Sequence, residues 1–122
     1  MYEYRARVLK VVDGDTIDFE IDVGFHLRLS MRIRLRGVDT PEVRGPSREQ
    51  GLAAAAFVRS QLPVDSTVLV QTHKIGKYGR YIADVRYLPG VAEPEVEALR
   101  SQGLNLADEL LERDMARAID PN

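Results

Sequence analysis

The chain of 122 residues is long enough for one domain of ordinary size and too short for two independent hydrophobic cores. A hydrophobic fraction of 44% with a charged fraction of 30% excludes a disordered or membrane composition, and the lack of cysteine excludes disulfides, thiolate metal sites and cysteine nucleophiles. The net charge of −2 argues against a generally basic nucleic-acid binder, yet residues 1–87 hold 14 basic against 11 acidic residues and residues 88–122 hold 3 against 8.

Alternation of polar and apolar residues predicts three β-strands early in the chain, at residues 2–12, 16–23 and 27–35. Asp13 and Gly14 lie between the first two strands and favour a hairpin turn, because both residues tolerate positive φ. Three strands with one apolar face each predict a curled meander that begins a small barrel. On the third strand we expect the apolar residues to face the core, namely Leu27, Leu29, Met31, Ile33 and Leu35.

An alanine-rich stretch at residues 52–62 predicts a helix after the third strand. Ser47 and Gln50 have the spacing of a capping box in front of it. Pro63 ends the helix, since proline cannot continue the pattern of backbone hydrogen bonds.

The second half of the chain predicts two more strands, at residues 66–72 and 80–87, and a final helix that Asn105 caps. The acidic segment 89–103 has a weak pattern, and we interpret it as an insertion. Five strands with a helix between the third and the fourth is the order of an OB-fold barrel. We therefore predict one mainly β domain with helices over residues 1–122. The buried stripe of the final helix is expected to comprise Leu106, Leu110, Leu111 and Met115.

Two aspartates at strand ends form the first candidate site. Asp15 follows the first turn and Asp39 follows the third strand, where a barrel holds side chains rigidly and leaves them open to solvent. Their carboxylates offer oxygen ligands to a hard divalent cation, although each aspartate alone is also an ordinary turn residue. Glu42 adds a third carboxylate. Such acids repel one another unless a cation or an arginine compensates, so we expect Asp15 to matter for cation binding more than for folding.

Arginines form the second candidate feature. Arg28 and Arg32 lie on the polar face of the third strand, and we interpret them as ordinary solvated surface. Arg34 lies five residues before Asp39, close enough to meet a phosphate held at the same cation. Arg80 follows a glycine-containing loop, from which it would approach the phosphate from the opposite side. The same loop offers a positive charge and an aromatic hydroxyl, at Lys77 and Tyr78.

Three strings together resemble the active-site motifs of the staphylococcal (micrococcal) nuclease family. They are VDGDT at residues 12–16, RLRGVDTPE at residues 34–42 and KYGR at residues 77–80. That family is a five-stranded OB-fold barrel with a helix after the third strand, so the resemblance extends to the order of elements.

The resemblance implies a calcium-dependent nuclease that hydrolyses phosphodiester bonds of DNA, RNA or both by cation-assisted attack of water. The implied Ca²⁺ ligands are Asp15, Asp39 and the backbone carbonyl of Thr40. The implied catalytic residues are Glu42, which acts on the attacking water as base or positioner, and the phosphate-binding pair Arg34 and Arg80. A neighbouring phosphate of the substrate would be contacted by Lys77 and Tyr78.

Two other functions are open on the sequence. An inert OB-fold module that binds single-stranded nucleic acid or protein would be expected to lack one of the carboxylates or arginines, and none is missing. A calcium-binding structural domain would not need Arg34 and Arg80.

Further expectations concern location and assembly. Polar and apolar residues alternate from Tyr2 onward, so the beginning of the chain lacks the apolar run of a signal peptide. We therefore expect a cytoplasmic protein without a membrane partner. Asp114 replaces the glycine common in the family, and the family's third helix and its base-stacking tyrosines are not expected before Asn122. Apolar surface left uncovered would favour a homodimer.

Overall fold

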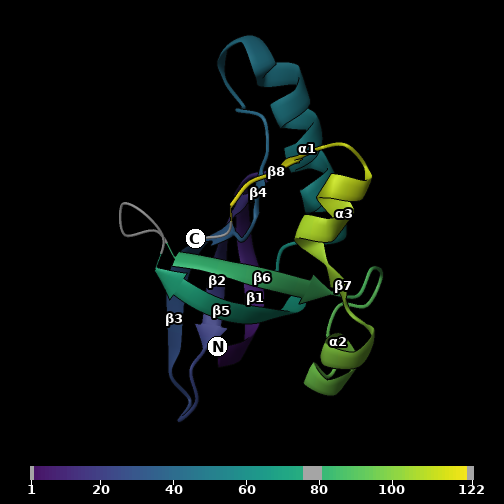
Figure 1. Ribbon diagram of the computed structural model, residues 1–122. Helices are drawn as coiled ribbons and strands as arrows, with labels where there is room; N and C mark the ends of the chain where they lie inside the picture. Colours follow the sequence, from purple (N-terminus) through teal and green to yellow (C-terminus); the bar gives the residue numbers. More distant parts are fainter. Residues whose placement is uncertain (1, 76–80, 121–122) are drawn as a thin grey trace.

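The computed structural model describes residues 2–75 and 81–120, which form a β-barrel with three α-helices packed beside it (Figure 1). The barrel strands are β1 (Tyr2–Asp13), β2 (Thr16–Asp22), β3 (Arg28–Leu35), β5 (Thr67–Ile75) and β6 (Tyr81–Tyr87). The helices are α1 (Arg48–Gln61), α2 (Val96–Gln102) and α3 (Leu106–Glu112). Short two-residue strands add β4 (Val38–Asp39), β7 (Leu104–Asn105) and β8 (Arg117–Ala118).

The barrel closes through one parallel pairing. β1 pairs antiparallel with β2 and β5, β2 pairs with β3, and β5 pairs with β6. Residues 33–35 of β3 then pair in parallel with residues 81–83 of β6, which completes the ring. This order, with α1 between β3 and β5, confirms the predicted OB-fold barrel.

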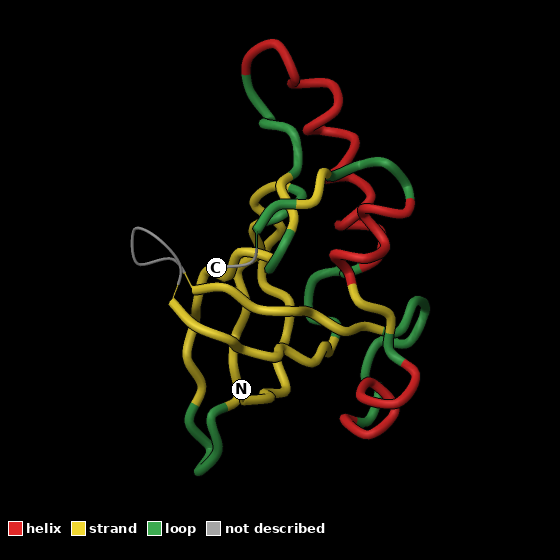
Figure 2. The backbone as a smooth tube through the Cα atoms, viewed as in Figure 1, coloured by secondary structure: helices red, strands yellow, loops and turns green. Residues whose placement is uncertain are grey.

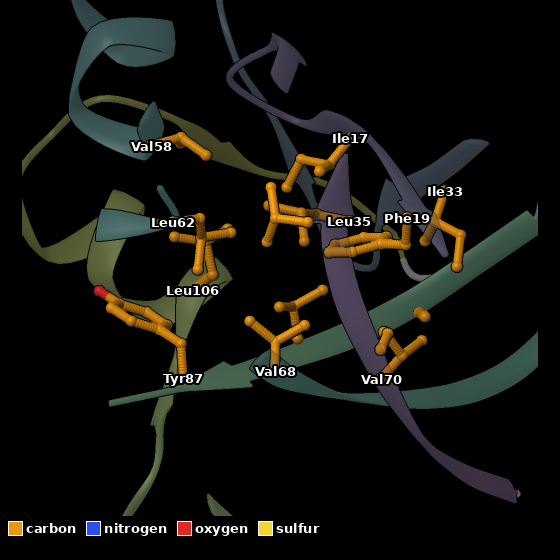
Figure 3. Packing of buried hydrophobic residues seen from close by; sticks show 14 of the residues in the cluster. Ile17, Phe19, Ile33, Leu35, Val58, Leu62, Val68, Val70, Tyr87 and Leu106 are labelled. Atoms are coloured by element: carbon orange, nitrogen blue, oxygen red, sulfur yellow. The ribbon is translucent and has the colours of Figure 1, made fainter. Parts of the chain in front are cut away.

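The core lies inside the barrel and under two helices. Ile17, Phe19 and Val70 point inward from their strands, as the alternation predicts. At one end of the barrel they are covered by Val58 of α1 and Leu106 of α3 (Figure 3). These helices therefore close the end of the barrel on which the β1–β2 turn and β4 also lie (Figure 1).

The β1–β2 turn differs from the prediction in position and in the reason for its glycine. Asp13 pairs with Thr16, so the turn consists of Gly14 and Asp15, and neither Asp13 nor Gly14 has a positive φ. A Cβ on Gly14 would lie 2.9 Å from the Cβ of Ala54 and 2.9 Å from Cγ2 of Thr40. Glycine is thus required because α1 packs directly against this turn.

The apolar face of β3 is only half buried. Ile33 and Leu35 are in the core, but Leu29 is 52% exposed, and Leu27, just before the strand, is 61% exposed, contrary to the prediction. The reason is the short β3–β6 pairing, which leaves the first half of β3 without a neighbour on one side among the described residues. The β2–β3 hairpin accordingly projects beyond the rest of the barrel (Figure 2).

The two predicted helix caps have different outcomes. Asn105 caps α3, because its Oδ1 accepts a hydrogen bond from the backbone N–H of Asp108 at 3.3 Å. Ser47 precedes α1 but has φ −97° and ψ 16°, which is not the extended conformation of a capping residue, and the predicted capping box is absent. Its hydroxyl instead donates to the carbonyl of Glu42 at 3.4 Å. Leu111 is at the surface rather than in the predicted buried stripe, because α3 turns this residue away from the barrel.

The acidic segment 89–103 packs on the barrel through α2, and the short strand β7 follows it directly. Leu99 of α2 is fully buried, and Arg100 donates to the carboxylate of Glu3 at 2.9 Å. β7 pairs with the end of β6 and extends the sheet by one strand. Within the described residues, the structure contains no helix with the length and apolar character needed to span a membrane.

Candidate active site

Three of the predicted site residues meet at one rim of the barrel. Nη1 of Arg34 lies 3.3 Å from Oδ2 of Asp15, and Nη2 donates to Oδ1 of Asp39 at 3.1 Å. The same Nη2 lies 3.2 Å from the carbonyl oxygen of Val38 and donates to it as well. One guanidinium at the end of β3 therefore holds two carboxylates that come from the β1–β2 turn and from β4.

Asp15 is a structural anchor as well as a candidate ligand. Only 4% of its surface is exposed. Its Oδ1 accepts a hydrogen bond from the hydroxyl of Thr16 and its Oδ2 accepts one from the backbone N–H of Thr40, each at 3.0 Å. Its loss would leave the buried N–H of Thr40 without its partner, which is costly, and would remove one of the two carboxylates that Arg34 contacts. The contacts thus give Asp15 a role in folding, and the expectation that it matters more for cation binding than for folding stays a prediction.

Glu42 borders the site from the segment that leads to α1. It is exposed, and it lines a hollow of about 430 Å³ together with Asp39, Thr40 and Arg117. Its backbone is fixed by Gly51 of α1, where an added Cβ would lie 2.1 Å from the carbonyl oxygen of Glu42. The helix therefore sets the position of Glu42 through direct backbone contact.

Arg117 is a site residue that the sequence motifs do not mark. Its Nε and Nη2 donate to Oδ2 of Asp39 at 3.3 Å and 3.2 Å. The two residues are 78 positions apart and become neighbours because β8 pairs with β4. No local pattern in the sequence indicates this pairing, since each strand has only two residues.

The pKa values of Asp13 and Asp15 are shifted in opposite directions. Burial raises the pKa of Asp13 to about 6, and hydrogen bonding to Asp15 and the negative charge of Asp15 act in the same direction. Burial alone would raise the pKa of Asp15 too, but hydrogen bonds from Asp13 and from the Thr40 N–H, with the charge of Arg34, lower it below its usual value. The site thus keeps Asp15 ionised and favours a proton on Asp13 in mildly acidic solution.

Asp13→Asn is expected to stabilise the protein at pH 7 to 8 in the presence of chelator. An acid whose pKa is raised by folding favours the folded state at low pH, and that contribution is lost as pH rises from about 4 to about 6. Asparagine carries no charge at either end of this range, so its advantage over Asp13 should shrink toward pH 4. Thermal melts of both proteins across pH 4 to 8 measure this difference, and a constant difference would contradict the raised pKa.

The remaining predicted residues are placed as follows. Arg32 binds Asp18 at 2.8 Å and Arg28 lies 3.6 Å from Glu20, both in exposed pairs, which confirms the interpretation of this face as solvated surface. Three further predicted residues lie outside the described residues, and their roles stay predictions: Lys77, Tyr78 and Arg80.

The oxygen atoms at the rim are suitable ligands for a hard divalent cation whose remaining ligands are oxygens of water or substrate. In residues 2–75 and 81–120, no cluster of three or more histidine, aspartate or glutamate side chains is arranged to hold a metal ion. Two carboxylates facing one guanidinium are nevertheless close together, and all the donors are oxygen. Oγ1 of Thr40 is buried beside them without a hydrogen-bond partner. Sites of one or two carboxylates completed by other oxygens are common for such cations.

Comparisons with known proteins give one family match and two relatives. The model of the family described as staphylococcal nuclease homologue matches residues 32–122. Protein ParB of Escherichia coli is 35% identical over 86 residues, which cover 68% of this chain and 42% of that protein. An uncharacterized protein of Methanocaldococcus jannaschii is 31% identical over 102 residues, covering 66% of this chain and 47% of that protein. The chain thus spans less than half the length of these two relatives.

Proposed function

The chain belongs to the family of staphylococcal nuclease homologues, and on that premise we propose that it is a calcium-dependent nuclease acting on DNA, RNA or both. The observation that carries the proposal is the guanidinium of Arg34, which is held between Asp15 and Asp39. Asp39 in turn lines the hollow that Glu42 borders. A mostly buried arginine beside two carboxylates combines a phosphate-binding fork with oxygen ligands for a cation.

Asp15, Asp39 and the carbonyl of Thr40 are the proposed cation ligands. A bound cation would supply concentrated positive charge, which neutralises phosphate oxygens and makes the phosphorus easier to attack. The rigidity of the ligands comes from the protein itself, because Thr16 and the N–H of Thr40 fix the carboxylate of Asp15. Preorganised ligands of this kind lose little entropy on binding.

Arg34 and Glu42 are the proposed catalytic residues on the described part of the chain. When water adds to the phosphorus, negative charge builds on the phosphate oxygens, and the planar guanidinium of Arg34 can donate two hydrogen bonds to them. Glu42 lines the hollow beside Asp39, where its carboxylate can orient the attacking water or take its proton. The bond to the leaving oxygen then breaks. Arg80 is proposed to assist from the loop before β6.

An inert nucleic-acid-binding module is the second candidate, and a specific feature favours it. All four oxygens of the two site carboxylates already accept hydrogen bonds or ion pairs within the chain. A network satisfied in this way can persist as pure structure, without exchange for a cation. The two candidates differ in whether nucleic acid is cut.

Cleavage assays with single-stranded and double-stranded DNA and RNA distinguish them. We expect no cleavage in excess chelator, because the oxygen ligands belong to a hard-cation site. We expect cleavage with calcium and weaker or no cleavage with magnesium, because the family to which the chain belongs is calcium-dependent in general. Glu42→Gln serves as a control that keeps all three proposed cation ligands and removes the proposed base. Undiminished cleavage in chelator would contradict the cation assignment. Binding of nucleic acid without cleavage in any cation would support the inert module.

A further inference from the structure

Arg117 is held beside Asp39 by the backbone of the C-terminal segment. β8 pairs antiparallel with β4, so that Arg117 lies opposite Asp39 and Ala118 lies opposite Val38. The N–H of Ile119 also donates to the carbonyl of Gly37 at 3.0 Å. These contacts involve main-chain atoms only. The position of Arg117 at the rim is therefore independent of what its side chain binds.

The side chain of Arg117 binds the oxygen of Asp39 that Arg34 does not contact. Arg34 donates to Oδ1, whereas both nitrogens of Arg117 donate to Oδ2. The carboxylate of Asp39 is thus enclosed by two guanidiniums. The side chain of Arg117 is 79% exposed and that of Asp39 is 35% exposed, so the outer pair lies in solvent and can open without unfolding the site.

We propose that Arg117 is the counter-ion of Asp39 in the cation-free protein and is displaced when a divalent cation takes this carboxylate. The inference rests on the proposed function, because it assumes that Asp39 is a cation ligand. Two effects act in the same direction. Arg117 competes directly for Oδ2, and its positive charge repels a dication that approaches within a few ångströms. Arg117 therefore weakens cation binding and sets the concentration at which the site fills.

A structural role for Arg117 would have the opposite effect. If Arg117 served only to hold Asp39 in its ligand orientation, its removal would loosen the ligand and weaken cation binding. The sign of the change in affinity therefore separates a competing counter-ion from a positioning contact. It can be measured with Ca²⁺ alone, without nucleic acid and without turnover.

The test is calorimetric titration of Ca²⁺ into the full chain and into Arg117→Gln. We expect Arg117→Gln to bind Ca²⁺ roughly two- to tenfold more tightly, the size of effect expected when one exposed charge beside a cation is removed. Arg117→Lys keeps the charge and should stay near the wild-type affinity. Thermal melts give a second readout, because Ca²⁺ should raise the melting temperature of Arg117→Gln more than that of the wild type.

Arg32→Gln is the matched control. Arg32 also forms an exposed pair with an aspartate, Asp18, through Nε and Nη2 at 2.8 Å and 3.1 Å, but this pair lies outside the site. The substitution Arg32→Gln removes one positive charge from β3, as Arg117→Gln removes one from β8, and should leave the Ca²⁺ affinity unchanged. If Arg32→Gln and Arg117→Gln increase the Ca²⁺ affinity equally, the effect is due to the net charge of the protein, and the proposal is overturned.

The remaining outcomes separate this inference from the proposed function. If the wild type binds Ca²⁺ and Arg117→Gln binds it equally or more weakly, the counter-ion role is wrong and the proposed function stands. If the wild type binds neither Ca²⁺ nor another divalent cation, the proposed function fails and the counter-ion role fails with it.

Discussion

Arg34→Ala is expected to lower kcat by about 10²-fold or more, the cost of removing one preorganised donor to developing negative charge. Arg34 is fixed before the reaction by Asp15, Asp39 and the carbonyl of Val38. A donor held in place gains more from the late charge of the transition state than from the ground state, so the loss should appear in turnover. Steady-state kinetics on a labelled oligonucleotide measure it.

Two further variants define the role of Arg34. Arg34→Lys should not restore kcat, since a point charge cannot replace a planar fork that reaches two groups at once. Arg28→Ala removes a solvated arginine of the same strand, 3.6 Å from Glu20, and should change mainly the salt dependence of binding. If Arg28→Ala and Arg34→Ala lose activity equally, or if Arg34→Ala raises KM with kcat intact, the strand is a general phosphate-binding surface.

Gly51→Ala is expected to destabilise the protein by about 1–3 kcal/mol, as overpacking does in a close contact. Intrinsic helix propensity predicts the opposite sign, because alanine favours a helix over glycine by about 1 kcal/mol. The contact decides, since the new Cβ would lie 2.1 Å from the carbonyl oxygen and 2.4 Å from the carbonyl carbon of Glu42. Denaturant unfolding measures the loss of stability.

The same variant should also lose activity. Relief of the clash must move α1 away from the segment that carries Glu42, and a shift of about 1 Å in a catalytic group can cost about 10²-fold in rate. Gln50→Ala is the matched control on the neighbouring exposed position of α1 and should be neutral or slightly stabilising. A stable, fully active Gly51→Ala would show that the contact does not position Glu42.

Much of the fold could be predicted because its strands have one buried face. Alternation located the five barrel strands, and Asn105 marked the start of α3. The meeting of Asp15, Asp39 and Arg34 could also be predicted, because all three lie at strand ends or turns of one meander. The local sequence indicates that these residues lie close together, because the turns between their strands are short.

The remaining features depend on contacts between distant segments. Leu29 alternates like a core residue, yet it is exposed because β6 pairs with only the last residues of β3. Gly14 has the signature of a turn glycine, yet glycine is needed there because Ala54 of α1 packs directly against it. Arg117 becomes a neighbour of Asp39 only through β8. None of these contacts follows from residue type or from periodicity.

The short β3–β6 pairing also bears on aggregation. Because this pairing covers only residues 33–35 of β3, the earlier part of the strand has a free edge in the described structure, next to the exposed side chains of Leu27 and Leu29. Such an edge is a template for sheet growth between copies. Arg28 and Arg32 flank it, and an antiparallel copy would bring like charges together. We therefore expect the arginines outside the site to disfavour pairing of the open half of the strand with a second copy.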